Sequence, residues 1–164
     1  MLRRFLVMTA VVAVALLAFS DDKPNPDQEK IQGTWTIETL SIWGTEPPKE
    51  FLAKRKVTID AKKMTLKPGI GWERATDPPN PDIITWKDAN QDGDVLSYTL
   101  KTSDKGAKLI EFTMEVGAEK KTLEAIYELD GDTLKIAASE KPPKDFSTGP
   151  GCTIYILKRD KNKK

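Results

Sequence analysis

The sequence predicts an all-β protein whose strands form an antiparallel up-and-down β-barrel of about eight strands. Short runs of alternating apolar and polar residues, the pattern of half-buried strands, recur along the chain from residue 29 onward. Residues that favour tight turns separate these runs at hairpin spacing, and no helical periodicity follows the N-terminal apolar segment. Connections between sequence neighbours favour a closed barrel over a sandwich, because closure removes exposed strand edges.

The N-terminal segment, residues 1–20, has the three parts of a secretory signal peptide. Arg3 and Arg4 precede an almost wholly apolar stretch, and the small residues Ala18 and Ser20 mark the cleavage point. The stretch is shorter than the roughly 20 residues of a membrane span, so we expect cleavage rather than an uncleaved anchor. The sequence therefore predicts export to the periplasm or the extracellular space, with no stable membrane insertion after cleavage.

The rest of the chain divides into a linker, one domain and a tail. Residues 21–28 are polar, contain two prolines and indicate a linker. Residues 29–159 contain all the alternating runs and are numerous enough for one domain with its own core. Residues 160–164 are mostly basic and predict a solvated end rather than a binding arm.

Composition excludes several classes of function. Removing residues 1–20 leaves 24 basic and 25 acidic residues, and this near-neutral balance argues against nucleic acid as a partner. The sequence contains no histidine, which removes histidine bases, triads and metal ligands. The single cysteine cannot form an intramolecular disulfide. We therefore expect no enzyme activity and no cofactor, and the sequence indicates no particular protein partner.

The first expected element is a strand at 31–37. Its residues alternate, with Gly33 and Trp35 on the buried parity, and the strand continues toward Trp43 with a kink. A proline pair then ends it. Residues 50–55 predict one short helical turn that packs against the barrel mouth.

A hairpin and an irregular segment follow. Residues 57–59 match 64–66 in parity across a four-residue loop, which predicts two paired strands. Residues 68–94 predict irregular structure, with a proline-rich loop and one short strand at 83–87. Further strands are expected at 96–100, 110–114 and 152–158.

The strongest hairpin signal is at residues 123–138. Asp130 and Gly131 supply the positive φ angles of a type I′ turn, so we expect them to form the two-residue loop. That loop would place Tyr127 opposite Leu134 and bring the apolar residues of both strands to one face. The inward residues are expected to be Tyr127, Leu129, Leu134 and Ile136.

Several segments resemble an uncharacterised family of small exported domains that is abundant in planctomycete bacteria. They are IQGTWT at 31–36, IYELDGDTLKI at 126–136, KPPKDFS at 141–147 and LKR at 157–159. The likeness covers residues 28–159, and the chain departs from it at 67–94, where a loop looks enlarged. The family has no established activity, so the resemblance implies an identity without a function.

At the level of the fold the chain also resembles lipocalins. Gly33 and Trp35 fit the Gly-x-Trp of the lipocalin opening strand, and Arg159 fits the basic residue near the last strand that lies over that Trp. Closure of a barrel pairs the first strand with the last. The sequence therefore predicts that the Arg159 guanidinium stacks on the Trp35 ring at the closed end.

Residues 88–94 match the first seven positions of a calcium-binding loop. Position twelve is Thr99 in place of the usual bidentate glutamate, and the flanks have strand patterns instead of helical ones. The alternative is a polar hairpin loop, for which Asn, Asp and Gly are the expected residues. Calcium, if bound, would be held weakly. The candidate metal ligands are Asp88, Asn90, Asp92 and Asp94.

Four aromatic residues are candidates for contact with a small apolar ligand: Trp43, Trp72, Trp86 and Tyr127. Aromatic residues at a barrel mouth can line a ligand entrance, or they can plug the barrel end. Two functions stay open, a non-catalytic binding module and a structural or interaction module whose barrel is filled by its own side chains. A cavity of about 300 Å³ or more would favour the first. A hydrolase ranks third, because no catalytic motif occurs.

Overall fold

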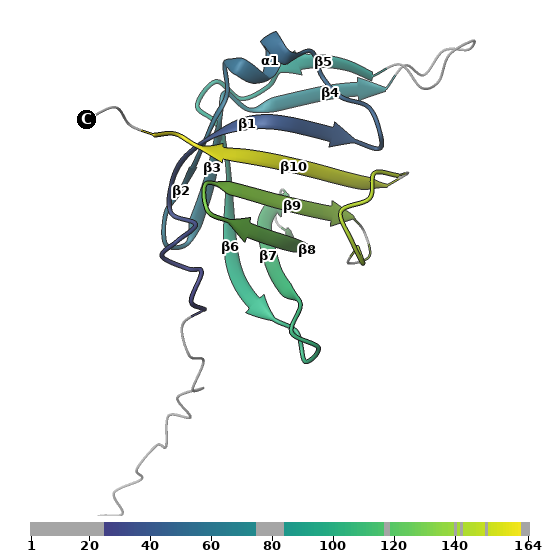
Figure 1. Ribbon diagram of the computed structural model, residues 1–164. Coiled ribbons are helices and arrows are strands. Elements are labelled where there is room, and N and C mark those ends of the chain that lie inside the picture. Colours follow the sequence, from purple (N-terminus) through teal and green to yellow (C-terminus); the bar gives the residue numbers. More distant parts are fainter. Residues whose placement is uncertain are drawn as a thin grey trace, which may run out of the picture.

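The computed structural model describes residues 25–74, 84–116, 119–139, 141, 143–149 and 151–161 (Figure 1). Within these residues the chain forms one short helix and strands that pair only in antiparallel fashion. In chain order the elements are β1 (Gly33–Ile42), α1 (Lys49–Ala53), β2 (Lys56–Ile59), β3 (Lys63–Lys67), β4 (Ile70–Arg74), β5 (Ile84–Asp88), β6 (Asp94–Thr102), β7 (Lys108–Val116), β8 (Glu119–Asp130), β9 (Thr133–Ser139) and β10 (Cys152–Arg159).

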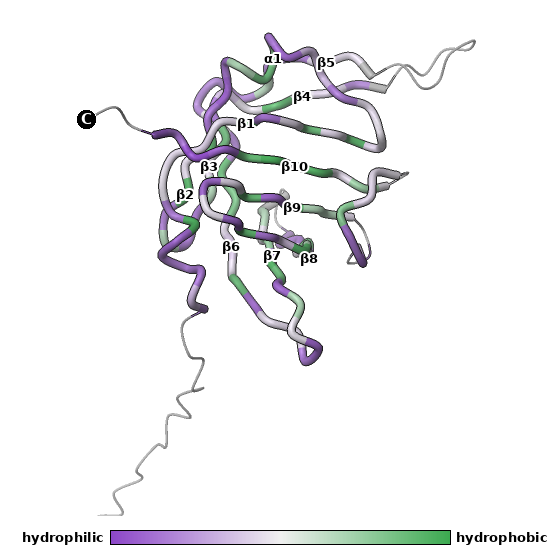
Figure 2. Tube along the Cα trace, viewed as in Figure 1, coloured by the Kyte–Doolittle hydropathy of each residue, from purple (hydrophilic) through white to green (hydrophobic). Residues whose placement is uncertain are grey.

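Eight of these strands close into a barrel in the order β1-β10-β9-β8-β7-β6-β3-β2, and the remaining two form a separate sheet, β4-β5. The first and last strands are paired, which closes the barrel. The predicted all-β fold class, an antiparallel barrel with one short helical turn, is therefore confirmed. Figure 2 shows hydrophobic residues within β9 and β10 and a hydrophilic turn between β6 and β7, as expected when alternate residues of each strand face the core.

Strand β1 contains the expected kink. Its pairing with β10 shifts register between Ile37 and Thr39, where the chain accommodates an extra residue as a β-bulge. Ile37 and Leu40 are both buried although they lie three positions apart, because the bulge changes which parity faces inward. The strand can therefore follow the curvature of the barrel and still end at the cavity described below.

The β2–β3 hairpin has the predicted register, with Val57 opposite Leu66 and Ile59 opposite Met64. In its loop the Asp60 carboxylate accepts the backbone N–H groups of Lys62 and Lys63. These bonds satisfy amides that the turn leaves free of the ladder.

The β8–β9 hairpin buries the face that was predicted, but the position of its turn differs from the prediction. Its two-residue loop is Gly131–Asp132, one residue later than expected, so Tyr127 lies opposite Ile136 and Leu129 opposite Leu134. Asp130 is the last residue of β8 and not a loop residue. Gly131 has φ +53° at the first loop position, where a glycine is most needed, and Asp132 has no positive φ, which fits type II′ rather than I′.

The segment between β3 and β6 is more regular than predicted. The short strand expected at 83–87 is present as β5, but it pairs with β4, which the sequence did not indicate. Trp72 of β4 and Trp86 of β5 lie directly opposite each other in the register of this two-stranded sheet. The proline-rich run at 77–81 lies outside the described residues.

The boundaries of the domain also differ from those predicted. Residues 25–28, expected to belong to a linker, lie against the closed end of the barrel, where the buried Asp27 carboxylate accepts a hydrogen bond from Lys108 at 2.7 Å. At the other terminus Asp160, expected to begin a free tail, donates its backbone N–H to Thr34 and pairs with Lys56. The folded domain therefore extends beyond 29–159 at both ends.

Candidate functional site

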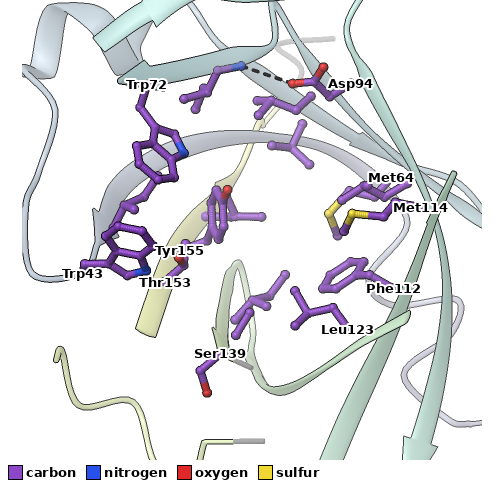
Figure 3. Close-up of a pocket in the computed structure, with 18 of the residues that line it drawn as sticks. Trp43, Met64, Trp72, Asp94, Phe112, Met114, Leu123, Ser139, Thr153 and Tyr155 are labelled. Carbon is purple, nitrogen blue, oxygen red and sulfur yellow. Dashed lines mark hydrogen bonds between the residues drawn. The ribbon is translucent and has the colours of Figure 1, made fainter. Parts of the chain in front are cut away.

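The barrel contains a cavity of about 580 Å³ at the end where β1 finishes and β10 begins (Figure 3). The inward side chains at this end leave space, whereas Trp35, Ile59 and Leu134 fill the opposite end and are almost fully buried. The cavity is lined by residues of the barrel strands and of β4: Ile42, Trp43, Val57, Met64, Leu66, Ile70, Trp72, Asp94, Leu96, Phe112, Met114, Leu123, Ile136, Ala138, Ser139, Gly151, Thr153, Tyr155 and Leu157.

Two indole rings form the mouth of the cavity. The Trp43 and Trp72 ring centroids lie 4.9 Å apart with an interplanar angle of 74°, an edge-to-face contact that aromatic pairs favour. Both side chains are more than a third exposed. Two large apolar groups are thus held in partial contact with solvent at the rim of an apolar space.

The backbone conformation of Trp43 is energetically unfavourable. Trp43 and Gly44 form a tight turn that pairs Ile42 with Thr45, and Trp43 adopts φ +55° in the left-handed region. A bulky residue in this region costs about 1–3 kcal/mol. Such strain occurs often where function requires a particular side chain, so the turn marks Trp43 as a candidate functional residue.

The cavity wall also has polar groups. Asp94, the first residue of β6, directs its carboxylate to the cavity, and its Oδ2 accepts the backbone N–H of Ile70 at 3.2 Å. Tyr155 of β10 lies between Asp94 and the two indole rings in Figure 3. Burial, with a smaller contribution from the charge of Asp94, raises the pKa of Tyr155 to about 12, so its hydroxyl is neutral at physiological pH.

Two of the residues predicted to contact a ligand, Trp86 and Tyr127, lie outside the cavity. The Trp86 ring packs against Phe51 of α1, with centroids 6.0 Å apart, and does not line the cavity. Tyr127 lies at the closed end, where its hydroxyl is 3.3 Å from Asp27 Oδ2 and 3.3 Å from Asn25 Oδ1. Of the four predicted aromatic residues, the cavity therefore includes Trp43 and Trp72.

The candidate calcium loop is organised by bonds within the protein. Asp88 pairs with the buried Arg55, and Asp94 faces the cavity. The Asn90 amide donates to the Gly93 carbonyl at 2.7 Å and accepts the Asp92 N–H at 3.1 Å. Among the described residues no three acidic or cysteine side chains come together as metal ligands. The side chains of Asp88, Asn90 and Asp94 thus bond to other groups of the protein, as expected for a polar loop.

Sequence reasoning missed Tyr155, Arg55 and the inward direction of Asp94. The final strand is apolar on both faces, so parity could not show that Tyr155 faces the cavity. The sequence placed Asp94 in the calcium motif, which does not indicate that it lines the cavity. Arg55 is fully buried beside Phe51, with its guanidinium carbon 3.5 Å from the ring centroid, and no periodic pattern predicts a buried arginine.

Comparison of the chain with models of known protein families found no match, and comparison with curated proteins found no significant match either. Within the described part of the chain, no helix has the length and apolar character needed to cross a membrane. The cavity geometry therefore carries the functional interpretation.

Proposed function

We propose that this protein is an exported, non-catalytic binding module that takes a small, largely apolar ligand into the open end of its barrel. The observation that carries the proposal is the cavity of about 580 Å³. Sites for small molecules commonly measure about 300–1,000 Å³ and are lined mainly by apolar and aromatic side chains. A barrel filled by its own side chains, the alternative function, would leave no space of this size.

The lining supports an apolar ligand. Met64, Met114, Phe112 and Leu123 face the cavity (Figure 3), and methionines adapt their shape to irregular partners. Transfer of apolar surface from water into such a site contributes about 25 cal/mol per Å². A ligand that also covers Trp43 and Trp72 would remove two exposed indole rings from water.

The proposal also includes export of the protein and its membership of a family, both of which are inferred from the sequence. Residues 1–20 support export, and the segments at 31–36 and 126–136 support membership of the planctomycete family. The Arg159–Trp35 stack at the closed end supports a relationship to lipocalins. A hydrolase has no comparable support, because the carboxylates that hydrolysis would require do not converge in the described cavity.

The proposal is tested by native mass spectrometry of protein purified from its own host, where a retained ligand adds mass. Binding of the neutral fluorescent probe N-phenylnaphthylamine gives an independent measurement. We expect Ala138→Phe, which adds a ring inside the cavity, to reduce probe binding at least about tenfold. The matched control is Ala107→Phe in the exposed β6–β7 turn, which should bind the probe as the original protein does. Absence of both added mass and probe binding would refute the proposal.

A further inference from the structure

We propose that the ligand carries a protonated amine and that the Asp94 carboxylate binds this group inside the cavity. The inference rests on the proposed binding function and adds the chemical class of the ligand. It starts from charge: among the described residues that line the cavity, Asp94 is the only one with an ionisable carboxylate or a cationic group. The remaining lining is apolar apart from hydroxyl groups and one indole pair.

Asp94 differs from Asp27 and Asp160, two carboxylates with a lysine partner near the closed end of the barrel. Asp27 is paired with Lys108 at 2.7 Å, and Asp160 with Lys56 at 2.7 Å. Within the described chain Asp94 has no lysine or arginine partner, and its carboxylate accepts a hydrogen bond at Oδ2 from the Ile70 N–H. Its Oδ1 therefore remains available to a donor that enters the cavity.

The surroundings make a cationic partner favourable. A carboxylate beside apolar walls is poorly solvated, so an ammonium group with matching charge gains more there than it would in bulk water. Ionised groups also form stronger hydrogen bonds than neutral groups, which corresponds here to at least about tenfold in affinity.

Aromatic groups that line the same cavity fit the same ligand. Tyr155, between Asp94 and the mouth in Figure 3, has a neutral hydroxyl that can accept a hydrogen bond from an ammonium group. The faces of Trp43 and Trp72 carry the negative potential that attracts organic cations. The negative charge of Asp94 opposes a carboxylate ligand, so a fatty acid is the wrong class.

The test uses three compounds that share one apolar chain and differ in head-group charge: octylamine, octanol and octanoate. Each displaces N-phenylnaphthylamine from the protein at neutral pH. We expect octylamine to bind about tenfold more tightly than octanol, and octanoate to bind most weakly.

Asp94→Asn should abolish the preference for octylamine, so that octylamine and octanol displace the probe about equally. The amide oxygen of Asn can still accept the Ile70 N–H, and retained binding of N-phenylnaphthylamine shows that the cavity has folded. Asp94→Ser, which also removes the charge, should give the same result. The matched control is Asp92→Asn in the same loop, an exposed position outside the cavity, which should retain the preference.

The outcomes separate this inference from the function on which it rests. Equal binding of the three compounds, or a preference that persists in Asp94→Asn, overturns the amine assignment and leaves ligand binding intact. Failure of the probe and of all three compounds to bind overturns both.

Discussion

At the closed end of the barrel, Arg159 joins the last strand to the first. Its guanidinium carbon lies 4.2 Å from the Trp35 ring centroid, and its Nη1 donates to the Gln32 carbonyl at 2.7 Å. Gly33 leaves room for this contact, because a Cβ there would lie 2.9 Å from Arg159 Nη1. The planar guanidinium can stack and donate at the same time, which an ammonium group cannot do.

This geometry predicts the effect of replacing Arg159. We expect Arg159→Ala to lower the free energy of unfolding by about 1–3 kcal/mol, since it removes a cation–π contact and a charged donor. Arg159→Lys should recover only part of the loss. Urea unfolding measures both, with exposed Lys158→Ala as the control, for which a change within about 0.5 kcal/mol is expected. Equal stability of all three variants would mean that the stack has no energetic role.

The raised pKa of Tyr127 predicts a loss of stability at alkaline pH. Burial, aided by the negative charge of Asp27, raises its pKa to about 12 from the ordinary 10.0. The folded state thus favours the neutral phenol, so this contribution is complete below pH 10 and is lost as the pH rises toward 12. Denaturant unfolding across this range should show a steeper decline for the original protein than for Tyr127→Phe. Tyrosinate absorbance provides the titration directly, and a Tyr127 that ionises near pH 10 would contradict the prediction.

At the scale of elements, the β4–β5 sheet is built outside the barrel ladder and brings Trp72 to the mouth. Arg55, two residues after α1, supports it through hydrogen bonds to the carbonyls of Phe51 and Gly69 and a pair with Asp88 of β5. Backbone bonds between Gly69 and the 89–90 segment close the base of the sheet. The mouth of the cavity therefore depends on one buried cation.

Replacing that cation should affect the small sheet more than the barrel. Arg55→Met leaves the carbonyls and Asp88 without their donor, and we expect the free energy of unfolding to fall by about 1–3 kcal/mol. Hydrogen exchange should accelerate in β4 and β5 more than in β8 and β9, and probe affinity should fall because Trp72 moves. Lys54→Met, at the exposed neighbouring position, is the control. Uniform acceleration over the whole barrel would contradict a local role.

At the scale of the whole molecule, the two ends of the barrel differ in how they are filled. The closed end is filled by large side chains and covered by residues 25–31. In this segment the buried Asp27 carboxylate accepts a hydrogen bond from Lys108, and the Gln28 side chain donates one to Tyr98. The open end holds the cavity and the indole pair. We expect stability to depend mainly on the first end and the proposed ligand binding on the second, so the effects of substitutions at the two ends should be separable.

This division predicts the consequence of shortening the chain. A chain that begins at Glu29 lacks the hydrogen bond from Lys108 to Asp27 and the bond from Gln28 to Tyr98. We expect it to unfold with about 1–3 kcal/mol less free energy than a chain that begins at Asp21. Probe binding should be retained in native conditions, since the cavity lies at the far end. Identical urea midpoints would restore the linker interpretation of residues 25–28.

The pattern within each hairpin was predictable because side chains alternate with a period of two. The β2–β3 register followed from matching parities and a defined loop. In β8–β9 the same parity rule gave the correct inward residues, Tyr127, Leu129, Leu134 and Ile136, yet left the turn one residue from its true place. Moving a two-residue loop by one position shifts pairing by two residues, which preserves the faces, so parity could not distinguish the two turns.

The sequence by itself determined the pattern of the barrel strands and the closure of first strand on last, because these follow from local periodicity and from one topological rule. Together with the resemblance to lipocalins, the same rule predicted the Arg159–Trp35 contact at the closed end. Only the tertiary structure showed that the other end holds a cavity, that Tyr155 faces it and that Tyr127 seals the opposite end. It also decided that Asp94 turns inward. These features depend on side-chain volumes from strands far apart in the chain, which no local pattern records.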